Sequence, residues 1–462
     1  MEKKGLVWLR RDLRLHDHGA LSAAIQEMDI LYLVFVFDPT FLDPLRAQGA
    51  RDRRIHFIAE SLLAIAQQLE AYSLGLCILE GDPVHEIPTF VRAHNISNLY
   101  FNRDYTPYAK GRDNKIKSIL KDQGVAVATF KDHVRFESDE VLKKDQTAYR
   151  VFTPYARQWR SCLEQESHGL DERVCDLSQV RPNPMPSPSN LSQILSQIQF
   201  QPYPAYLKGG TQEARSALNK FSSFINAYHQ DRDYPALDHT SHLSVYIRHG
   251  CISIREILNF ALDSYPSEGA FVWVNELIWR DFYQMVLAQF PHVVTAPFNS
   301  KFNEFIYPGD PQHYHAWCQG KTGYPIIDAA MRCLNETGWM HNRLRMITAS
   351  FFCKLLLLDW RKGEAYFARH LLDYDLASNN GGWQWSSGTG CDAAPYYRIF
   401  NPYTQSRKFD SSGTFIRKYC PELAHLDSKQ IHTPVSLPTY SRPIIDYRSQ
   451  REQSLLSYQL LK

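Results

Sequence analysis

The sequence predicts an α/β domain with a doubly wound parallel sheet, followed by an all-helical C-terminal domain. Three observations predict this. Residues 6–133 alternate short apolar runs with amphipathic stretches, which is typical of strand–helix–strand units. Beyond residue 211, long segments show helical periodicity with few β-branched runs. The length of 462 residues also favours two or more domains over a single core.

Five apolar runs in the first third of the chain predict buried parallel strands. They are Leu6–Leu9, Ile30–Phe37, Leu74–Leu79, Leu99–Phe101 and Val125–Phe130. The segments between them at 51–72, 83–94 and 107–123 have the spacing of amphipathic helices. The turn after the first strand, Arg10–Asp17, contains no glycine fingerprint, so we do not expect a dinucleotide to be held there in the Rossmann manner.

The middle of the chain predicts a long connection between two domains. Residues 134–210 have weak periodicity and dense proline, as in Arg181–Pro188, and proline disfavours helix interiors and central strands. We therefore expect domains at 1–133 and 211–462, joined by a surface linker. In the second domain, helical periodicity is clearest at 268–289, 325–337 and 341–358.

Composition narrows the class of protein. The net charge of +2 neither indicates nor excludes nucleic acid, because charge can segregate to one face. The nine cysteines are scattered, without a CxxC pair or zinc-site spacing, so we expect neither disulfides nor a metal site. No signal-like apolar region follows Met1, and the run at 30–37 is too short to span a bilayer. We expect a cytoplasmic protein, without a membrane partner or an obligate protein partner.

The most informative stretch runs from Gly323 to Asp410. It contains the segments Gly338–Met346 (GWMHNRLRM) and Asp373–Trp385 (DYDLASNNGGWQW). Tryptophan, amide and guanidinium groups are concentrated here, without a nucleophile–base pair or a metal-ligand cluster. Such groups suit stacking on flat rings and electron transfer between them.

These segments resemble, almost letter for letter, the C-terminal signature of the DNA photolyase/cryptochrome family. The resemblance extends over nearly the whole chain and is closest to bacterial class I cyclobutane pyrimidine dimer photolyases. The matching segments are Arg10–Asp17, Thr240–Ser244, Asn275–Tyr283, Gly320–Ile327 and Gly338–Asp410. The resemblance implies an N-terminal antenna-chromophore domain and a helical domain that encloses FAD. It also implies a lyase that transfers an electron from photoexcited, reduced FAD to a flipped-out dimer in double- or single-stranded DNA.

The resemblance implies a set of FAD-binding residues. Asn379 matches the position that faces flavin N5, and Arg345 is expected to pair with Asp373 because an unpaired buried charge is costly. The hydroxyls and backbone N–H groups of 240–244 suit a pyrophosphate, although the family often has Arg where this chain has His242. The full set is Tyr228, Thr240, Ser241, His242, Leu243, Ser244, Glu276, Trp279, Arg280, Asn342, Arg345, Asp373, Tyr374, Asp375 and Asn379.

A second implied set contacts the lesion and the DNA. Glu276 and Trp279 are three residues apart and share a helix face, as do Asn342 and Met346, which are four apart. Relatives that repair (6-4) photoproducts carry histidines at the positions that match Asn342 and Met346. The absence of these histidines favours the cyclobutane lesion as the substrate. The DNA-binding residues are Arg232, Trp279, Asn342, Arg343, Trp385 and Gln405. The resemblance implies catalytic roles for Glu276, Asn342, Met346, Asn379, Trp383, Trp360 and Tyr307.

The sequence departs from the family in two places. Trp383 and Trp360 match the inner and middle members of the electron relay, but the outermost position is Tyr307, with Trp317 as an alternative end. Tyr108-Ala109 replaces the Asn-Glu pair of folate-binding relatives. This favours 8-hydroxy-5-deazaflavin or FMN as the antenna, with 5,10-methenyltetrahydrofolate still possible.

Two other functions stay open at this stage. A cryptochrome, a blue-light photoreceptor without repair activity, would share the fold and FAD. A light-independent flavin reductase or electron-transfer protein is the weaker alternative. Asn379 and the set of lesion-contacting residues favour the repair enzyme over both alternatives. We also expect the protein to be a monomer.

Overall fold

The computed structural model describes residues 2–166, 170, 172–433 and 437–459. It divides into two compact units. Unit 1 comprises Met1–Val141, Trp159–Asn226 and Ser241–Val274, and unit 2 comprises Leu142–Gln158, Ala227–Thr240 and Asn275–Lys462. No helix in the described part of the chain is both long and apolar enough to cross a membrane.

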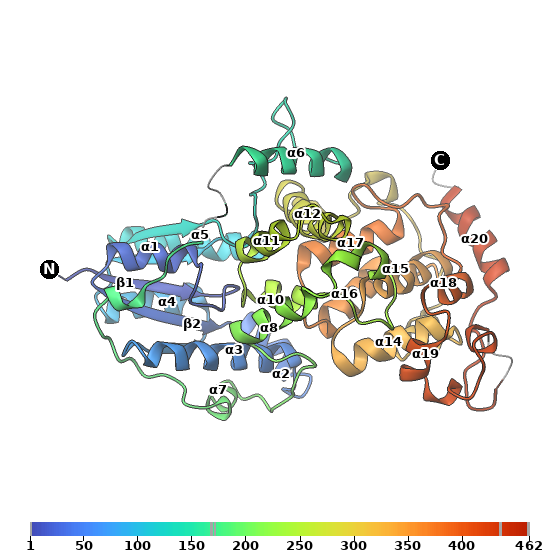
Figure 1. Cartoon of the computed structure of the whole chain (residues 1–462), viewed down its shortest axis with the longest axis horizontal. Coiled ribbons are helices and arrows are strands. Elements are labelled where there is room, and N and C mark those ends of the chain that lie inside the picture. Colours follow the sequence, from blue (N-terminus) through green and yellow to red (C-terminus); the bar gives the residue numbers. More distant parts are fainter. Residues whose placement is uncertain (1, 167–169, 171, 434–436, 460–462) are drawn as a thin grey trace. The chain divides into compact units, whose positions relative to one another are not determined.

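Unit 1 is built on a five-stranded parallel sheet (Figure 1). Its strands are β1 (Lys4–Leu9), β2 (Ile30–Phe37), β3 (Leu76–Glu80), β4 (Asn98–Asn102) and β5 (Ala126–Phe130). The strand order is β3-β2-β1-β4-β5, so the direction of winding reverses between β1 and β4. The register aligns Leu6 with Tyr32 on β2 and with Leu99 on β4. The predicted doubly wound parallel sheet is confirmed.

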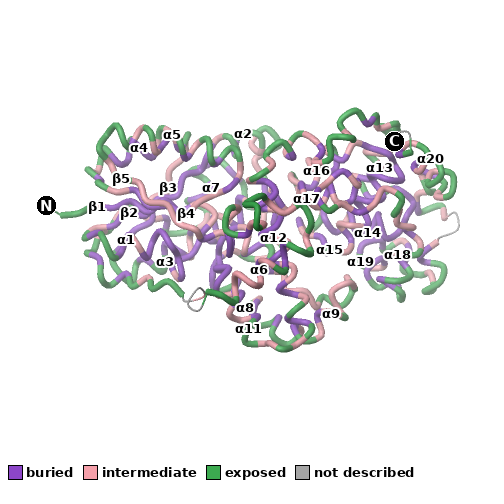
Figure 2. Tube along the Cα trace, turned by 90° about the horizontal axis from the view of Figure 1, so that it is seen from above, coloured by how far each residue is buried: buried purple, intermediate pink, exposed green. Residues whose placement is uncertain are grey.

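Helices cover both faces of the sheet, with α4 and α5 on one side and α1 and α3 on the other (Figure 2). The side chains of Trp8, Val34 and Phe101 point to the first face and pack on α4 and α5 through Phe90 and Ile116. The helices are α1 (Gly19–Glu27), α2 (Pro39–Arg46), α3 (Arg53–Glu70), α4 (Pro83–Ala93) and α5 (Pro107–Asp122). The sequence predicts α3, α4 and α5 but neither α1 nor α2.

The region 134–210, predicted to be a long surface linker, contains regular elements. These are α6 (Phe152–Gln165), η1 (Leu177–Gln179) and α7 (Leu191–Gln197). The later segments of unit 1 add α8 (Thr211–Phe221), η2 (Ile225–Ala227, whose last residue belongs to unit 2), α10 (Leu243–His249) and α11 (Ile254–Asp263). The sequence-based domain boundaries stay a prediction.

A buried ionic network fastens α11 to the sheet within unit 1. Arg255 Nε contacts Asp17 Oδ1 at 2.8 Å, and its Nη2 contacts Asp132 Oδ1 at 2.9 Å. Arg14 Nη2 contacts the other oxygen of Asp132 at 2.6 Å. All four side chains are buried. Burial opposes ionisation of Asp132, but the nearby positive charges hold its pKa below the usual range.

Unit 2 is helical. Its helices, including α12 whose first residues precede the unit, are α9 (Tyr228–Asp231), α12 (Glu268–Gln289), η3 (Pro291–Val294), η4 (Ser300–Phe302), α13 (Pro311–Cys318), α14 (Pro325–Thr337), α15 (Asn342–Ser350), η5 (Phe351–Leu355), α16 (Trp360–His370), α17 (Leu376–Ser387), α18 (Pro402–Phe409), α19 (Thr414–Tyr419), η6 (Pro421–Leu423), η7 (Gln430–His432) and α20 (Tyr447–Gln459). Both α12 and α14 have the predicted bounds. The helix predicted at 341–358 is α15 followed by one π-helical turn, η5. The predicted helical C-terminal region is confirmed.

Candidate active site

The helix α12 presents Glu276 and Trp279 one turn apart. Glu276 Oε1 accepts from Arg232 Nη1 at 2.7 Å, and both side chains are partly exposed. Partial burial of the carboxyl raises the pKa of Glu276, although the charge of Arg232 acts in the opposite direction. The structure thus pairs a residue predicted to contact DNA with one predicted to contact the lesion.

The short turn between α14 and α15 places Asn342 at a helix start. Gly338 ends α14 in the left-handed region, at φ 74°, and His341 caps α15 by accepting from the Arg343 N–H at 3.2 Å. Asn342 Nδ2 lies 3.8 Å from Met346 Sδ, so the two predicted neighbours are in contact. Asn342 is exposed and Met346 is half-buried.

Arg343 extends away from these two side chains. Its Nη2 lies 2.7 Å from Asp233 Oδ1, and its guanidinium lies 4.5 Å from the ring centroid of Phe409. Its predicted role in holding a DNA phosphate therefore requires it to exchange Asp233 for the phosphate, or to bind both.

The predicted ion pair between Arg345 and Asp373 is present. Arg345 Nη2 donates to Asp373 Oδ2 at 2.8 Å, and Arg345 Nε donates to the Met340 carbonyl at 2.7 Å. Asp373 Oδ1 and Thr240 Oγ1 are buried and have no hydrogen-bond partner among the described residues. Buried polar atoms without partners are costly, so these two atoms fit a site that is completed by a polar ligand.

The start of α17 orients two further predicted residues. Asp375 caps the helix, accepting from the Ser378 N–H at 3.0 Å, and it also accepts from Gln284 Nε2 at 3.0 Å. Asn379 Nδ2 donates to Glu364 twice, to the backbone oxygen at 3.1 Å and to Oε1 at 2.9 Å. Both donations come from the amide nitrogen, which leaves the Asn379 carbonyl oxygen as an acceptor for another group.

Two adjacent glycines make one face of α17 tight and another open. A Cβ atom on Gly381 would lie 2.2 Å from Cδ1 of Tyr283, so α12 and α17 approach closely there. A Cβ on Gly382 would meet no atom within 4 Å. Because Gly382 is three residues after Asn379, the open space adjoins the Asn379 side of the helix. A flat ring can approach this face, so these residues fit the isoalloxazine of FAD.

The segment predicted to hold the pyrophosphate has a distinctive backbone. His242 is left-handed, at φ 53°, immediately before α10, and Ser241 Oγ accepts weakly from the Leu243 N–H at 3.4 Å. The side chain of Leu243 is buried, whereas that of Ser244 is exposed. Leu243 can therefore offer only its backbone to a ligand.

The other predicted residues occupy varied positions in unit 2. Tyr228 is buried, Tyr374 and Trp385 are half-buried, and Arg280 Nη1 lies 3.7 Å from Asp281 Oδ1. Gln405 Oε1 is buried without a hydrogen-bond partner in the described chain.

The relay tryptophans Trp317, Trp360 and Trp383 are buried, whereas Tyr307 is half-buried. Trp383 packs against α16 so closely that a Cβ on Gly363 would lie 2.1 Å from its Cη2 atom, and Trp360 begins the same helix. Trp317 contacts Trp383 edge to face, with ring centroids 6.0 Å apart. Burial raises the pKa of Tyr307, whose hydroxyl has no hydrogen-bond partner among the described residues. The phenolic proton of Tyr307 therefore lacks an evident acceptor.

The residue that replaces the folate-binding pair has its own partners in unit 1. Tyr108 Oη donates to the carboxylate of Asp38, and its ring meets Phe41 edge to face with centroids 5.7 Å apart. Arg112 lies over the same ring, 5.6 Å from its centroid. Tyr108 is thus part of an aromatic and polar cluster, while the neighbouring Ala109 is buried.

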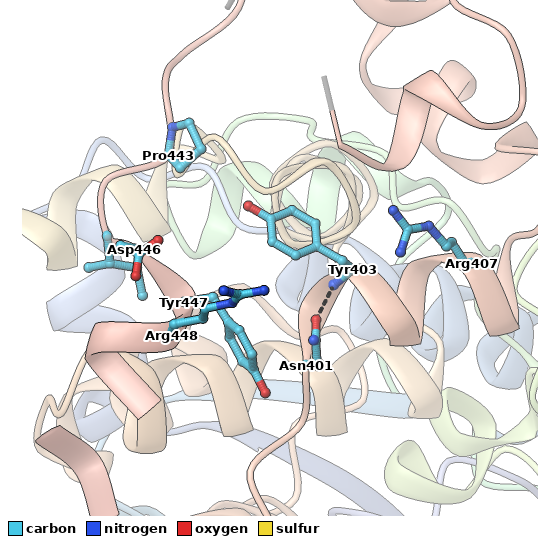
Figure 3. Close-up of a pocket in the computed structure, with 8 residues that line it drawn as sticks. Asn401, Tyr403, Arg407, Pro443, Asp446, Tyr447 and Arg448 are labelled. Carbon is cyan, nitrogen blue, oxygen red and sulfur yellow. Dashed lines mark hydrogen bonds between the residues drawn. The ribbon is translucent and has the colours of Figure 1, made fainter. Parts of the chain in front are cut away.

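An open pocket of about 530 Å³ lies elsewhere in unit 2, between the starts of α18 and α20 (Figure 3). It contains none of the predicted site residues. Its lining residues are Asn401, Tyr403, Arg407, Pro443, Ile445, Asp446, Tyr447 and Arg448. Asn401 serves as the cap of α18, accepting from the Tyr403 N–H at 3.0 Å. No cluster of described His, Cys, Asp and Glu side chains is suited to hold a metal ion.

Three residues of the site were not anticipated from the sequence. Glu364 and Gln284 hold predicted residues from other helices, and Phe152 stacks on Trp279. Each contact joins residues more than ten positions apart, so helical spacing contains no signal for it. Only Gln284 could have been suspected, as the polar residue within the otherwise apolar run 282–288 of α12.

Comparison with known proteins identifies the family. The family model described as DNA photolyase matches residues 5–174, and the FAD binding domain of DNA photolyase matches residues 273–460. The deoxyribodipyrimidine photo-lyase of Escherichia coli is 37% identical over 475 residues, covering 98% of this chain and 98% of that protein. The chain belongs to the DNA photolyase family of enzymes.

Solved structures of the family share the fold. A class III photolyase from Agrobacterium tumefaciens has a TM-score of 0.90 and 32% identity, covering 100% of this chain and 98% of that one. A Synechocystis cryptochrome has a TM-score of 0.85 and 26% identity, with 99% of each chain covered. This photolyase-family chain therefore carries an FAD-binding domain. Because repair enzymes and cryptochromes share the fold, the site residues must distinguish the two functions.

Proposed function

We propose that this chain repairs cyclobutane pyrimidine dimers in DNA in a light-driven reaction that uses bound, reduced FAD. The observation that carries the proposal is the contact between Asn342 and Met346, together with Glu276 and Trp279 on α12. The amide can bond a base edge, the thioether can pack on a thymine methyl group, and the indole can stack. Histidine acids are absent at 342 and 346, which suits a lesion that opens on gaining an electron.

The chain's own residues bind and orient the lesion. When bound and reduced, FAD supplies the light-absorbing group and the electron that opens the dimer. Glu276 hydrogen-bonds the polar edge of the dimer, accepting from an N–H when ionised and donating to a carbonyl when protonated. Trp279 and Trp385 provide aromatic surfaces for the flipped-out bases. Arg232 and Arg343 bind the phosphates of the damaged strand.

The cofactor is held mainly by residues of unit 2. Asp373 and Thr240 contribute polar atoms that have no hydrogen-bond partner among the described residues, and Asn379 offers its carbonyl oxygen to a ring N–H. Arg345 holds Asp373 in place through their ion pair. The remaining contacts come from Tyr228, Ser241, His242, Leu243, Ser244, Arg280, Tyr374 and Asp375, as the family resemblance implies.

An antenna chromophore binds unit 1 at the carboxyl edge of the sheet. Ligands of open parallel sheets bind where the winding reverses, which here is between β1 and β4. Arg10 and Arg11 follow β1, and Asp104 follows β4. Burial of Asp104 opposes its ionisation, but the positive charges of Arg11 and Arg10 lower the pKa of Asp104 to about 2. The Tyr108 cluster replaces the folate anchors, so we favour a deazaflavin or FMN. We propose further that the enzyme is monomeric and cytoplasmic.

One assay tests the proposal. Purified protein reconstituted with FAD and chemically reduced is mixed with an oligonucleotide that carries one cyclobutane dimer, under blue light or in the dark. We expect dimer loss only under light, and no action on a (6-4) photoproduct. A protein that binds FAD but repairs neither lesion would support the photoreceptor alternative instead.

A further inference from the structure

We propose that Phe152 is a positioning residue for lesion recognition, which fixes the plane of the Trp279 indole. This inference rests on the proposed function, in which Trp279 stacks on the dimer. Phe152 comes from the 134–210 region, where the sequence suggested only a connection between domains. The structure places residues 142–158 with the helical unit.

The two rings form a face-to-face stack. Their centroids are 3.6 Å apart and their planes differ by 3°. Phe152 therefore covers one face of Trp279. The indole is nevertheless only half-buried, so part of it remains open beyond this contact. A flipped-out base can stack only on the face that Phe152 leaves free.

Phe152 is itself held at both its backbone and its ring. Its N–H donates to Asp392 Oδ2 at 3.0 Å, and two residues earlier the Arg150 carbonyl accepts from Cys391 Sγ at 3.1 Å. The ring meets Phe282 edge to face, with centroids 5.8 Å apart. Because Phe282 is fully buried in α12, it fixes the Phe152 ring relative to the helix that carries Trp279.

A second contact from the same segment reinforces this arrangement. Tyr155 is fully buried one turn after Phe152 and packs on Phe282, with ring centroids 5.2 Å apart. Phe282 also meets the edge of Trp279 at a centroid distance of 5.7 Å. Phe152, Phe282 and Trp279 thus form a closed triangle of ring contacts.

An indole without such support would lose more freedom on binding. The terminal torsion of an aromatic side chain has broad wells, so a half-exposed indole samples several orientations. Ordering it against a base costs free energy, which a preformed stack removes in advance. Undamaged DNA binds through phosphate contacts, so a fixed orientation of the Trp279 indole does not strengthen its binding. Phe152 should therefore favour damaged over undamaged DNA.

The first experiment compares Phe152→Leu with Phe152→Tyr in the FAD-loaded enzyme. Dissociation constants are measured for a dimer-containing oligonucleotide and for its undamaged counterpart. We expect Phe152→Leu to bind the dimer-containing oligonucleotide about three- to tenfold more weakly, because that is the contribution of one aromatic pair to affinity. Its affinity for undamaged DNA should change little. Phe152→Tyr keeps the ring and should bind like the parent. Equal losses on both DNAs would overturn the proposal.

A double-mutant cycle tests whether Phe152 acts through Trp279. In a Trp279→Ala background, Phe152→Leu should cause no further loss of lesion affinity. A full additional loss would show that Phe152 acts independently of the indole.

A measurement without DNA separates this inference from the proposed function. In protein labelled with 5-fluorotryptophan, the Trp279 resonance is assigned by its loss in Trp279→Phe. Phe152→Leu should shift that resonance, because the ring current of the stacked phenyl disappears, whereas Phe152→Tyr should shift it little. An unmoved resonance in Phe152→Leu would refute the positioning role. If the parent showed no preference for damaged DNA, the proposed function would fail, while this spectrum would still report on the stack.

Discussion

At the scale of single residues, Glu276 is the side chain whose chemical state matters most. In the proposed mechanism, replacing Glu276 by Ala leaves the polar edge of the lesion without a partner, and such a hydrogen bond is typically worth about 1.5–3 kcal/mol. We expect Glu276→Ala to slow dimer repair at saturating light by about tenfold or more. Met346→Ala removes only packing and should slow it modestly. Repair at the parental rate in Glu276→Ala would contradict the assigned role.

The pH dependence of repair follows from the same residue. Burial raises the pKa of Glu276, and the protonated form, which can donate a hydrogen bond, predominates below that pKa. We therefore expect repair by the parent to decline as the pH rises through the pKa of Glu276. Glu276→Gln donates at every pH and should flatten that decline. A similar decline in Glu276→Gln would assign the titration to another group.

The end of the electron relay can be decided between two residues. Trp317 is in ring contact with Trp383, whereas the buried hydroxyl of the half-buried Tyr307 has no evident acceptor for its proton among the described residues. We expect Trp317→Phe to diminish the protein radical formed under blue light more than Tyr307→Phe does. Spin resonance of the FAD-loaded, oxidised protein measures that radical. A phenoxyl signal that disappears in Tyr307→Phe would establish the tyrosine instead.

Sequence reasoning succeeded where partners lie close along one helix or match a family motif. The contact between Asn342 and Met346 follows from their spacing, and the pair of Arg345 and Asp373 from the cost of a lone buried charge. The pairing of Glu276 with Arg232 could not be predicted in this way. Its members are far apart in the chain, and their contact depends on how α9 and α12 meet.

At the scale of elements, the sequence predicted those with a strong hydrophobic period. Strand β2 and helices α12 and α14 have the predicted bounds. Helix α1 was not predicted because most of its positions are buried, which removes the alternation of polar and apolar residues. Helix α2 contains Pro44 in its interior. The π-helical turn η5 was not predicted either, because a single widened turn leaves no clear trace in the hydrophobic period.

The turn η5 buries Lys354. Its Nζ donates to the carbonyls of Pro395 and Arg398 at 3.1 and 3.2 Å, and burial lowers the pKa of Lys354 to about 8. An unfolded lysine keeps its proton to about pH 10.5, so between these values the unfolded chain binds more protons. Lys354 should therefore add stability as the pH rises from about 8 to 10.5, by at most about 3 kcal/mol.

The test compares unfolding in denaturant for the parent and Lys354→Met across that pH range. The difference in unfolding free energy between them should shift in favour of the parent as the pH rises. Lys321→Met, at an exposed position, serves as the control and should show no such shift. A pH-independent difference for Lys354→Met would mean that the buried amine does not titrate in this range.

At the scale of the whole molecule, the two units are each assembled from distant parts of the chain. In unit 1, Arg255 joins the segment 241–274 to Asp17 and Asp132. Removing one member of a buried ionic network leaves charges without compensation, at a typical cost of about 3–5 kcal/mol. We expect Arg255→Met to lower the unfolding free energy by about that amount. Arg215→Met, which removes an exposed ion pair to Glu256, should cost less than about 1 kcal/mol. Equal effects of the two substitutions would show that the network adds little to stability.

A net charge of +2 means that DNA binding must depend on local cations rather than on total charge. Each phosphate contact releases counterions, so affinity for dimer-containing duplex should fall steeply with salt. Arg343→Gln should reduce the slope of log affinity against log salt by about 1.

Asp233→Asn should raise the affinity for DNA, because Arg343 then binds a phosphate without first leaving a carboxylate. Since a partly exposed ion pair is worth at most about 1 kcal/mol, the gain should be no more than about fivefold. Two results would contradict this role of Arg343: a DNA affinity that does not change with salt, or weaker DNA binding by Asp233→Asn. Either result would show that Arg343 stabilises the fold and does not bind the phosphate backbone.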